Sequence, residues 1–259
     1  MIDIHSHILP EIDDGARSMD EALRMAAIAF ADGIQQMICT PHLFNGLSND
    51  PRTAEIEDRV AALQNAIGSN GLKVLPGSEV RVTSELIKQS QADLHTKLNL
   101  KTYMLTELPT PSVPRGTRSW FRKLKLQGVN PILVHPERNL EIQRSPWIVA
   151  DLVADGVLTQ VTAMSVSGQF GLAAKTCADS LLRHNCVHFL ATDTHRPEKR
   201  PPVLSRGRES AAAIIGPDAA RVLVEDNPLA VVNGMPIVPP AVIPYDKKSG
   251  SFFGRLFGR

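Results

Sequence analysis

The chain has 259 residues, 43% of them hydrophobic and 21% charged, so it can bury a full-sized core. Its 28 Lys and Arg residues nearly balance 27 Asp and Glu, and the resulting net charge of +1 argues against nucleic acid as a partner. Three widely spaced cysteines disfavour disulfides and structural zinc, so a cytoplasmic location is expected. No apolar run approaches about 18 residues, which disfavours a membrane span.

Short apolar runs alternate with longer segments of helical period, which is typical of β/α units around a parallel sheet or barrel. The predicted strands lie near 1–5, 36–40, 73–79, 103–107, 131–135, 157–162 and 187–192. The predicted helices cover 18–33, 51–71, 118–127, 145–155, 169–185 and 203–215. Ser18 or Asp20 can cap the first helix, and Gly33 can end it. Seven strands with intervening helices favour an α/β barrel over an open sheet.

The composition changes after about residue 235, where prolines and then Gly, Ser and basic residues dominate. We therefore expect a single barrel domain over residues 1–235 and a tail over 236–259. The end of the tail combines basic and apolar side chains in SFFGRLFGR. Either it docks on an anionic membrane surface, a partner protein or a second subunit, or it is a disordered end.

The first strand carries two histidines in the sequence HSH. His5 and His7 occupy positions i and i+2 of a strand, so they project to the same side and can hold one ion together. Taken alone, this pair is equally compatible with an ordinary half-buried strand.

The carboxyl ends of six of the seven predicted strands carry metal-capable side chains. Besides His5 and His7, these are His42, Glu79, Glu107, His135, Asp193 and His195. Active sites of parallel barrels lie at this end, so the side chains are expected to converge in space. Imidazole and carboxylate donors without thiolate suit Mn, Zn or Fe, and they are too many for one tetrahedral ion. We predict two or three divalent ions, with Mn, Zn and Fe all open on donor chemistry, and hydrolysis as the chemistry.

Five motifs, HSHILPEIDDG, TPH, GSEVR, HPERN and TDTHRPEKRPP, follow one another from residue 5 to residue 202. Together they closely resemble the PHP (polymerase and histidinol phosphatase) superfamily, and within it the bacterial CpsB/CapC/YwqE-type protein-tyrosine phosphatases. This resemblance implies a distorted (β/α)7 TIM-like barrel with a trinuclear metal site. It also implies a substrate: phosphotyrosine on bacterial tyrosine kinases that control capsule or exopolysaccharide assembly.

The resemblance also implies how the ligands divide among three ions. One set is His5, His7, Glu79 and Asp193; the second is Glu79, Glu107 and His135; the third is Asp14, His42 and His195, with Glu79 as a bridge. Asp14 is assigned by resemblance alone. Its neighbour Asp13 is expected to be a surface turn residue, with support of the metal site as the alternative.

Phosphate recognition favours arginine, which keeps its charge and can donate two hydrogen bonds to an oxyanion. Arg138 follows the ligand His135, and Arg200 follows His195; both are similar in position to the phosphate-binding arginines of the family. The predicted mechanism is attack of a metal-bound hydroxide on phosphorus, with both arginines stabilising the phosphoryl oxygens.

A different phosphatase chemistry has a nominal match in the segment CADSLLR. Cys177 and Arg183 have the C-x5-R spacing of cysteine-dependent tyrosine phosphatases. A phosphate cradle needs a tight loop with inward-pointing amides, whereas these residues continue a helical run. We therefore interpret Cys177 as a packing thiol.

Two alternative functions stay open. One is a small-molecule phosphoesterase of the same superfamily, similar to histidinol-phosphate phosphatase. The other is a regulator that binds its kinase without catalysis. Family resemblance also admits a homo-oligomer.

Overall fold

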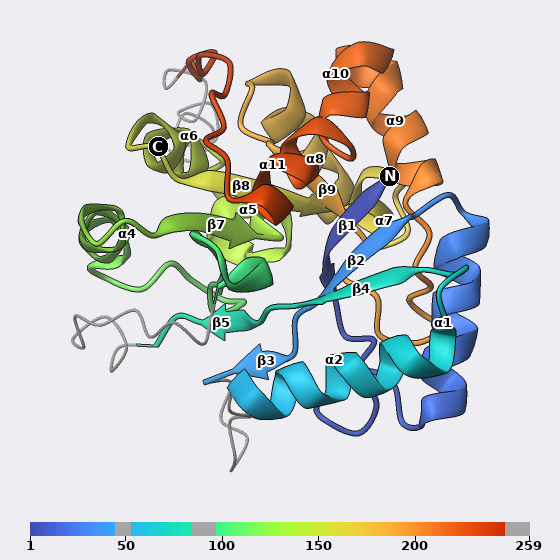
Figure 1. Cartoon of the computed structure of the whole chain (residues 1–259). Helices are drawn as coiled ribbons and strands as arrows, with labels where there is room; N and C mark the ends of the chain where they lie inside the picture. The colour runs from blue at the N-terminus through green and yellow to red at the C-terminus, as the bar shows by residue number, and fades with distance from the viewer. Residues whose placement is uncertain (45–52, 84–96, 247–259) are drawn as a thin grey trace.

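A ring of parallel strands forms the centre of the computed structural model, which describes residues 1–44, 53–83 and 97–246. The strands are β1 Ile2–Ser6, β2 Gln36–Cys39, β3 His42–Leu43, β4 Lys73–Pro76, β5 Glu79–Arg81, β6 Tyr103–Glu107, β7 Asn130–Val134, β8 Leu158–Thr162 and β9 Phe189–Ala191. They pair in the orders β1-β2-β4 and β3-β5-β6-β7-β8-β9. The ring closes where the Asp193 amide donates to the His5 carbonyl at 3.0 Å (Figure 1).

Two of the predicted strands are each broken in two, which distorts the barrel. The predicted strand 36–40 is β2, which β3 continues after a two-residue gap, and the predicted strand 73–79 is β4 and the first residue of β5. Pro41 lies in the first gap and has no amide to donate. Gly77 lies in the second gap, where an added Cβ would be 2.7 Å from Ile38 Cγ2. The prediction that Glu79 ends a strand was therefore wrong, because it begins β5 and pairs with His42 at the start of β3. Counting each broken strand once, the predicted (β/α)7 barrel is confirmed.

The helices surround the ring. They are α1 Met19–Ala31, α2 Thr53–Ile67, α4 Thr117–Leu126, α5 Leu140–Arg144, α6 Trp147–Ala154, α7 Ala163–Val166, α8 Leu172–Arg183, α9 Ser205–Ile215, α10 Pro217–Val222 and α11 Asp226–Asn233, with 3-10 turns η2 Leu98–Leu100 and η3 Pro136–Arg138. Ser18 was one of the two residues predicted to cap this helix, and it caps α1 by accepting a hydrogen bond from the Glu21 amide. The short helices α5, α7, α10 and α11 were not predicted, since they are too short to show a clear period.

The barrel interior is apolar at the end opposite the carboxyl ends of the strands. Side chains from β1, β2, β4, β6, β7, β8 and β9 form one buried cluster there, and Val231 and Val232 of α11 join it. The Ile2 amide donates to the Val224 carbonyl at 2.8 Å, which holds the start of β1 beside the segment that leads into α11. The polar site can therefore occupy only the other end of the barrel.

Residues 241–245 lie against the C-terminal end of α8. The Ile243 amide donates to the His184 carbonyl at 3.0 Å, and the Tyr245 ring stacks on His184 with centroids 3.6 Å apart. Residues 247–259 lie outside the described residues, as does the predicted docking segment SFFGRLFGR. The division at residue 235 stays a prediction.

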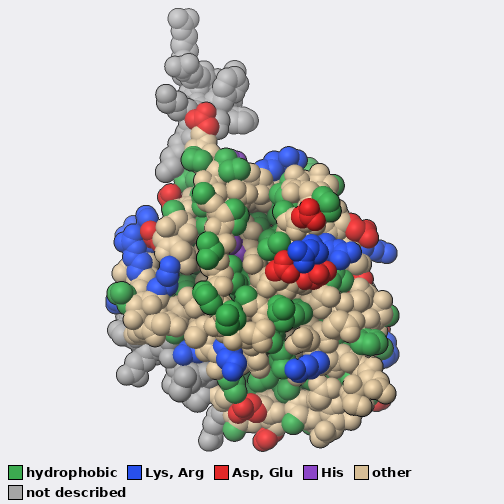
Figure 2. All heavy atoms as spheres, turned by 45° about the horizontal axis from the view of Figure 1, so that its top comes forward, with side chains coloured by type: hydrophobic (Ala, Val, Ile, Leu, Met, Phe, Trp, Pro, Cys, Tyr) green, Lys and Arg blue, Asp and Glu red, His purple; other side chains and the backbone are tan. Residues whose placement is uncertain are grey.

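The surface of the described residues mixes charge of both signs. On the face that Figure 2 shows, acidic and basic side chains are interspersed among apolar ones. In the described part of the chain, no helix has both the length and the apolar character needed to cross a membrane.

The tight packing at Gly77 predicts a stability effect. A Cβ there would lie 2.7 Å from Ile38 Cγ2 and 3.0 Å from Leu98 Cδ2. Gly77→Ala is therefore expected to lower the free energy of unfolding by about 1–3 kcal/mol, because the buried neighbours must shift. Urea unfolding followed by circular dichroism measures this, and a change below about 0.5 kcal/mol would contradict the packing argument.

Candidate metal centre

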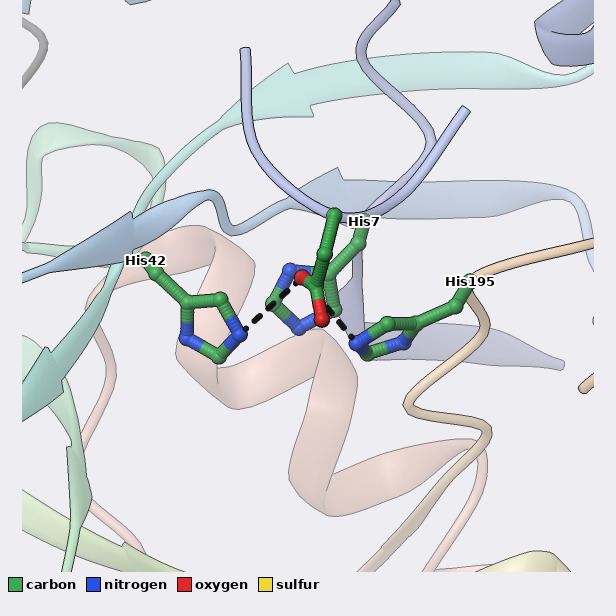
Figure 3. A group of neighbouring side chains, drawn as sticks. His7, His42 and His195 are labelled. Atoms are coloured by element: carbon green, nitrogen blue, oxygen red, sulfur yellow. Dashed lines mark ion pairs between the residues drawn. The ribbon is translucent and has the colours of Figure 1, made fainter. Parts of the chain in front are cut away.

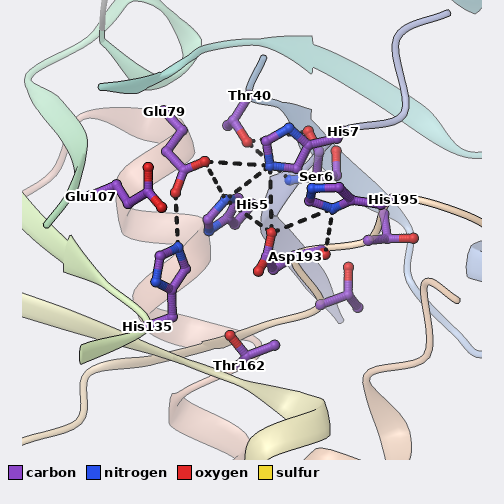
Figure 4. A network of polar contacts seen from close by, with 12 residues as sticks. His5, Ser6, His7, Thr40, Glu79, Glu107, His135, Thr162, Asp193 and His195 are labelled. Carbon is purple, nitrogen blue, oxygen red and sulfur yellow. Dashed lines mark hydrogen bonds and ion pairs between the residues drawn. The ribbon is translucent and has the colours of Figure 1, made fainter. Parts of the chain in front are cut away.

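Nine side chains predicted as metal ligands come together at the carboxyl ends of the strands. Four groups of three or four have donor atoms all within 4.8 Å of one another. The groups are His7, Asp14, His42 and His195; His5, His7 and Asp193; His5, Glu79 and His135; and His42, Glu79 and Glu107. Each of the nine belongs to at least one group, although they come from seven separate segments of the chain. Figure 4 shows seven of them: His5, His7, Glu79, Glu107, His135, Asp193 and His195.

The local backbone conformation directs these side chains toward the same space. The pairing of β1 with β2 shifts register between Asp3 and Ser6. In a regular strand the side chains of Ile4 and His5 would point to opposite sides. The register shift changes this alternation, so Ile4 can join the apolar interior while His5 faces the site. His135 and Asp193 have positive φ angles, 33° and 51°, which are unfavourable for residues other than glycine. Strain of this kind at two candidate ligands is typical of functional sites.

Glu79 is the centre of the cluster. Its Oε1 lies 2.9 Å from His135 Nε2, and its Oε2 lies 2.8 Å from His42 Nδ1 and 3.4 Å from the Nε2 atoms of both His5 and His7. Burial alone would raise the pKa of Glu79, but the charge of His5 and contacts from the other histidines hold it well below its usual range. The carboxylate is therefore an anion that the site must balance with positive charge.

Asp14 lies between two histidines at the mouth of the site. Its Oδ1 is 3.4 Å from His42 Nε2 and 3.5 Å from His195 Nε2, and the rings of His7, His42 and His195 converge on the same space (Figure 3). Hydrogen bonding from His42 holds the pKa of Asp14 well below its usual range. Burial lowers the pKa of His195 to about 3, so its imidazole is neutral and able to bind a metal. This is the place expected for the third ion.

The chemistry of the donors fits divalent cations. Glu79 Oε2 and His42 Nδ1 are both buried, and neither has a hydrogen-bond partner within the described residues although the two atoms are 2.8 Å apart. A cation held by both atoms would satisfy them at once. The imidazole and carboxylate donors suit Mn, Zn or Fe, and the number of donors exceeds what one ion can use.

Acceptors behind the histidines fix the direction of their rings. Asp13 Oδ2 accepts from His7 Nδ1 at 2.8 Å, and Gln160 Oε1 accepts from His5 Nδ1 at 2.9 Å. The Asp193 carbonyl lies 3.0 Å from His195 Nδ1. In each case the Nε2 atom keeps a lone pair that points into the site and can bind a metal, which is the arrangement of a metal-binding histidine.

Asp13 is therefore not the surface turn residue that was expected. Its side chain is 1% exposed, and Oδ1 also accepts from the Gly15 amide at 2.9 Å. The turn sequence IDDG indicated the alternative role, since one carboxylate can close the turn while its neighbour reaches the metals. Gln160 was not predicted at all. A long amide side chain in the middle of the buried strand sequence LTQVT is the signal that could have identified it.

Asp193 joins the cluster to the two arginines predicted to bind phosphate. Its Oδ1 lies 3.4 Å from His7 Nε2, while its Oδ2 accepts from Arg138 Nη1 at 2.6 Å and from Arg200 Nη2. Both guanidinium groups thus lie beside the carboxylate that faces the metals. The Nε of Arg200 is buried without an acceptor among the described residues, and a phosphoryl oxygen would supply one.

The cysteine alternative is excluded by burial. Cys177 lies within α8 and is 4% exposed, and burial raises the pKa of its thiol to about 12. A phosphatase nucleophile needs a lowered thiol pKa and an open loop. The interpretation of Cys177 as a packing residue is confirmed.

The fold and this cluster define a metal-binding parallel barrel of the PHP type. The family model "Capsular polysaccharide synthesis, CpsB/CapC" matches residues 1–233, and the chain belongs to this family. Tyrosine-protein phosphatase YwqE of Bacillus subtilis is 37% identical over 203 residues, which cover 77% of this chain and 79% of YwqE. The putative tyrosine-protein phosphatase CapC of Staphylococcus aureus is 32% identical over 207 residues, 80% of this chain and 81% of CapC.

Solved structures agree with this assignment. One of them has a TM-score of 0.89 and 32% identity to this chain. It comes from work on YwqE of Bacillus subtilis and CpsB of Streptococcus pneumoniae, which are described as metal-dependent tyrosine phosphatases. The match covers 95% of this chain and all (100%) of the other. A D-hydantoinase with a TM-score of 0.50 and 12% identity, covering 86% of this chain and 68% of its own, shares the barrel fold alone.

The hydrogen bond between Asp13 and His7 predicts a supporting role in metal binding. Asp13→Ala is expected to weaken metal affinity about 10- to 100-fold, because the His7 ring loses the acceptor that orients it. Calorimetric titration of the metal-free protein with Mn²⁺ measures this. Asp20→Ala, which removes an exposed carboxylate from α1, is the control. Equal affinity in the two variants would contradict the proposed role.

Proposed function

We propose that this protein is a metal-dependent protein-tyrosine phosphatase that acts on a bacterial tyrosine kinase controlling capsule or exopolysaccharide assembly. The observation that carries the proposal is the juxtaposition of a nine-residue metal cluster with two arginines that share Asp193. The family match and the names of the relatives support the substrate class. Mn²⁺ is the proposed metal, with Zn²⁺, Fe²⁺ or Mg²⁺ as alternatives.

The proposed division of ligands among three ions is the one that the family resemblance implies, and it overlaps with the groups that the side chains form without matching each of them. His5, His7, Glu79 and Asp193 would hold one ion, Glu79, Glu107 and His135 a second, and Asp14, His42 and His195 a third. Glu79 would bridge, since its two oxygens face different histidines. When bound, such ions acidify a water molecule and polarise the phosphoryl oxygens.

The chain's own residues have separate tasks around the ions. Arg138 and Arg200 bind the phosphoryl oxygens and stabilise the charge that spreads over them during transfer. Asp13 and Gln160 hold two imidazole rings in the tautomer that leaves Nε2 unprotonated. The three cysteines take no part in the reaction, because Cys39, Cys177 and Cys186 are all buried away from solvent.

Removal of metal is expected to abolish hydrolysis of a phosphotyrosine peptide, and Mn²⁺ to restore it. His135→Ala should remain inactive with every ion, since it removes a donor that contacts Glu79 at 2.9 Å. Alkylation of thiols should leave most of the activity, because all three cysteines are buried. Turnover by metal-free protein, or loss on alkylation alone, would contradict the mechanism.

The same assay separates the alternative functions. Faster turnover of histidinol phosphate than of the phosphotyrosine peptide would favour the small-molecule phosphoesterase. Complementation of a deletion strain by inactive His135→Ala would favour the non-catalytic regulator. Docking by the tail, assembly into oligomers, the cytoplasmic location and the lack of a nucleic-acid partner stay predictions.

The two arginines are expected to act on the transition state. Arg138→Ala and Arg200→Ala should each lower kcat/KM about 100-fold, the usual cost of removing one donor to a developing oxyanion. Steady-state kinetics with the phosphotyrosine peptide measure this, and metal content measured alongside separates it from damage to the cluster. Arg144→Ala, at an exposed position in α5, is the matched control. An equal effect in all three variants would contradict phosphate binding.

A further inference from the structure

One aromatic ring lies against both phosphate-binding arginines. The guanidinium carbon of Arg138 is 5.1 Å from the centroid of the Phe170 ring, and that of Arg200 is 5.5 Å from it. These are cation–π distances. Arg138 follows β7 and Arg200 follows β9, so a single side chain contacts two loops at the mouth of the barrel.

A short, well-defined turn holds Phe170 in this place. It belongs to the five residues between α7 and α8, where Gly168 and Gly171 have φ angles of +84° and +88°. The Gln169 amide donates to the Met164 carbonyl at 2.8 Å, and the Gly171 amide to the Gly168 carbonyl at 3.1 Å. Phe170 is only partly buried, which leaves part of the residue accessible.

We propose that Phe170 is a specificity residue, whose ring packs against the phenyl ring of phosphotyrosine and selects aryl over alkyl phosphoesters. This inference rests on the proposed function. In an aryl phosphate a single oxygen joins the ring to phosphorus, so a group beside the bound phosphate also lies beside the ring. Offset or edge-to-face aromatic pairs add affinity beyond the area they bury.

A purely structural role for Phe170 makes a different prediction. If the ring only holds the arginines in place, its loss would weaken every phosphate ligand to the same extent. If it contacts the substrate ring, its loss would weaken aryl ligands selectively. The ratio of two affinities therefore distinguishes the roles.

The test uses the metal-loaded protein and two probes, phenylphosphonate and methylphosphonate, with binding measured by calorimetry. In Phe170→Leu the preference for the phenyl compound should fall about tenfold, the value of a good aromatic pair. Phe170→Tyr should retain it. Phe30→Leu, the same change at a 40% exposed position of α1, should leave it as in the parent protein. Phe170→Met replaces Phe170→Leu if the latter does not fold.

The outcomes separate this inference from the proposed function. A parent protein with no preference for the phenyl compound, or an unchanged preference in Phe170→Leu, would overturn the inference. Equal weakening of both probes would also overturn it, since that result marks a residue that only positions the arginines. Failure of the parent protein to hydrolyse a phosphotyrosine peptide with any metal would overturn the proposed function instead, because the binding measurement does not depend on turnover.

Discussion

The buried carboxylate of Glu79 is the constraint on which the site depends. An anion that is 1% exposed must be balanced by nearby positive charge, and donor atoms of four histidines lie within 3.4 Å of it. The breaks in two strands bring Glu79 and His42 to the same level of the barrel, where they pair. The strand breaks that distort the barrel thus also bring these donors together, in a set that fits divalent cations.

A second layer of interactions keeps this arrangement in place. Asp13 and Gln160 orient two imidazole rings from behind, and Asp193 shares its two oxygens between histidine and arginine. Asp193 can hold its unfavourable backbone conformation because its amide also closes the barrel against His5. Both arginines are therefore joined to the cluster through one carboxylate, and the Phe170 ring lies against both guanidinium groups.

Eight of the nine candidate ligands could be predicted because chemistry restricts their residue types and parallel barrels restrict their place. Asp14 was assigned by resemblance alone, and resemblance also supported the choice of Arg138 and Arg200. Metal sites need imidazole and carboxylate, and these occur at the ends of strands that hydrophobic period identifies. The breaks at Pro41 and Gly77 could not be predicted in the same way. Nothing local distinguishes a glycine that continues a strand from one that must avoid Ile38, a residue 39 positions away in the chain.

The sequence by itself determined the order of β/α units, the donor types and the exclusion of cysteine chemistry, since these depend on residue identity and local period. Only the tertiary structure decided which acceptors stand behind His5, His7 and His195, that the Asp13 side chain is buried, and that the Phe170 ring lies against two arginines. Those contacts join segments far apart in the chain. Their distances follow from how the barrel closes, which no single segment encodes.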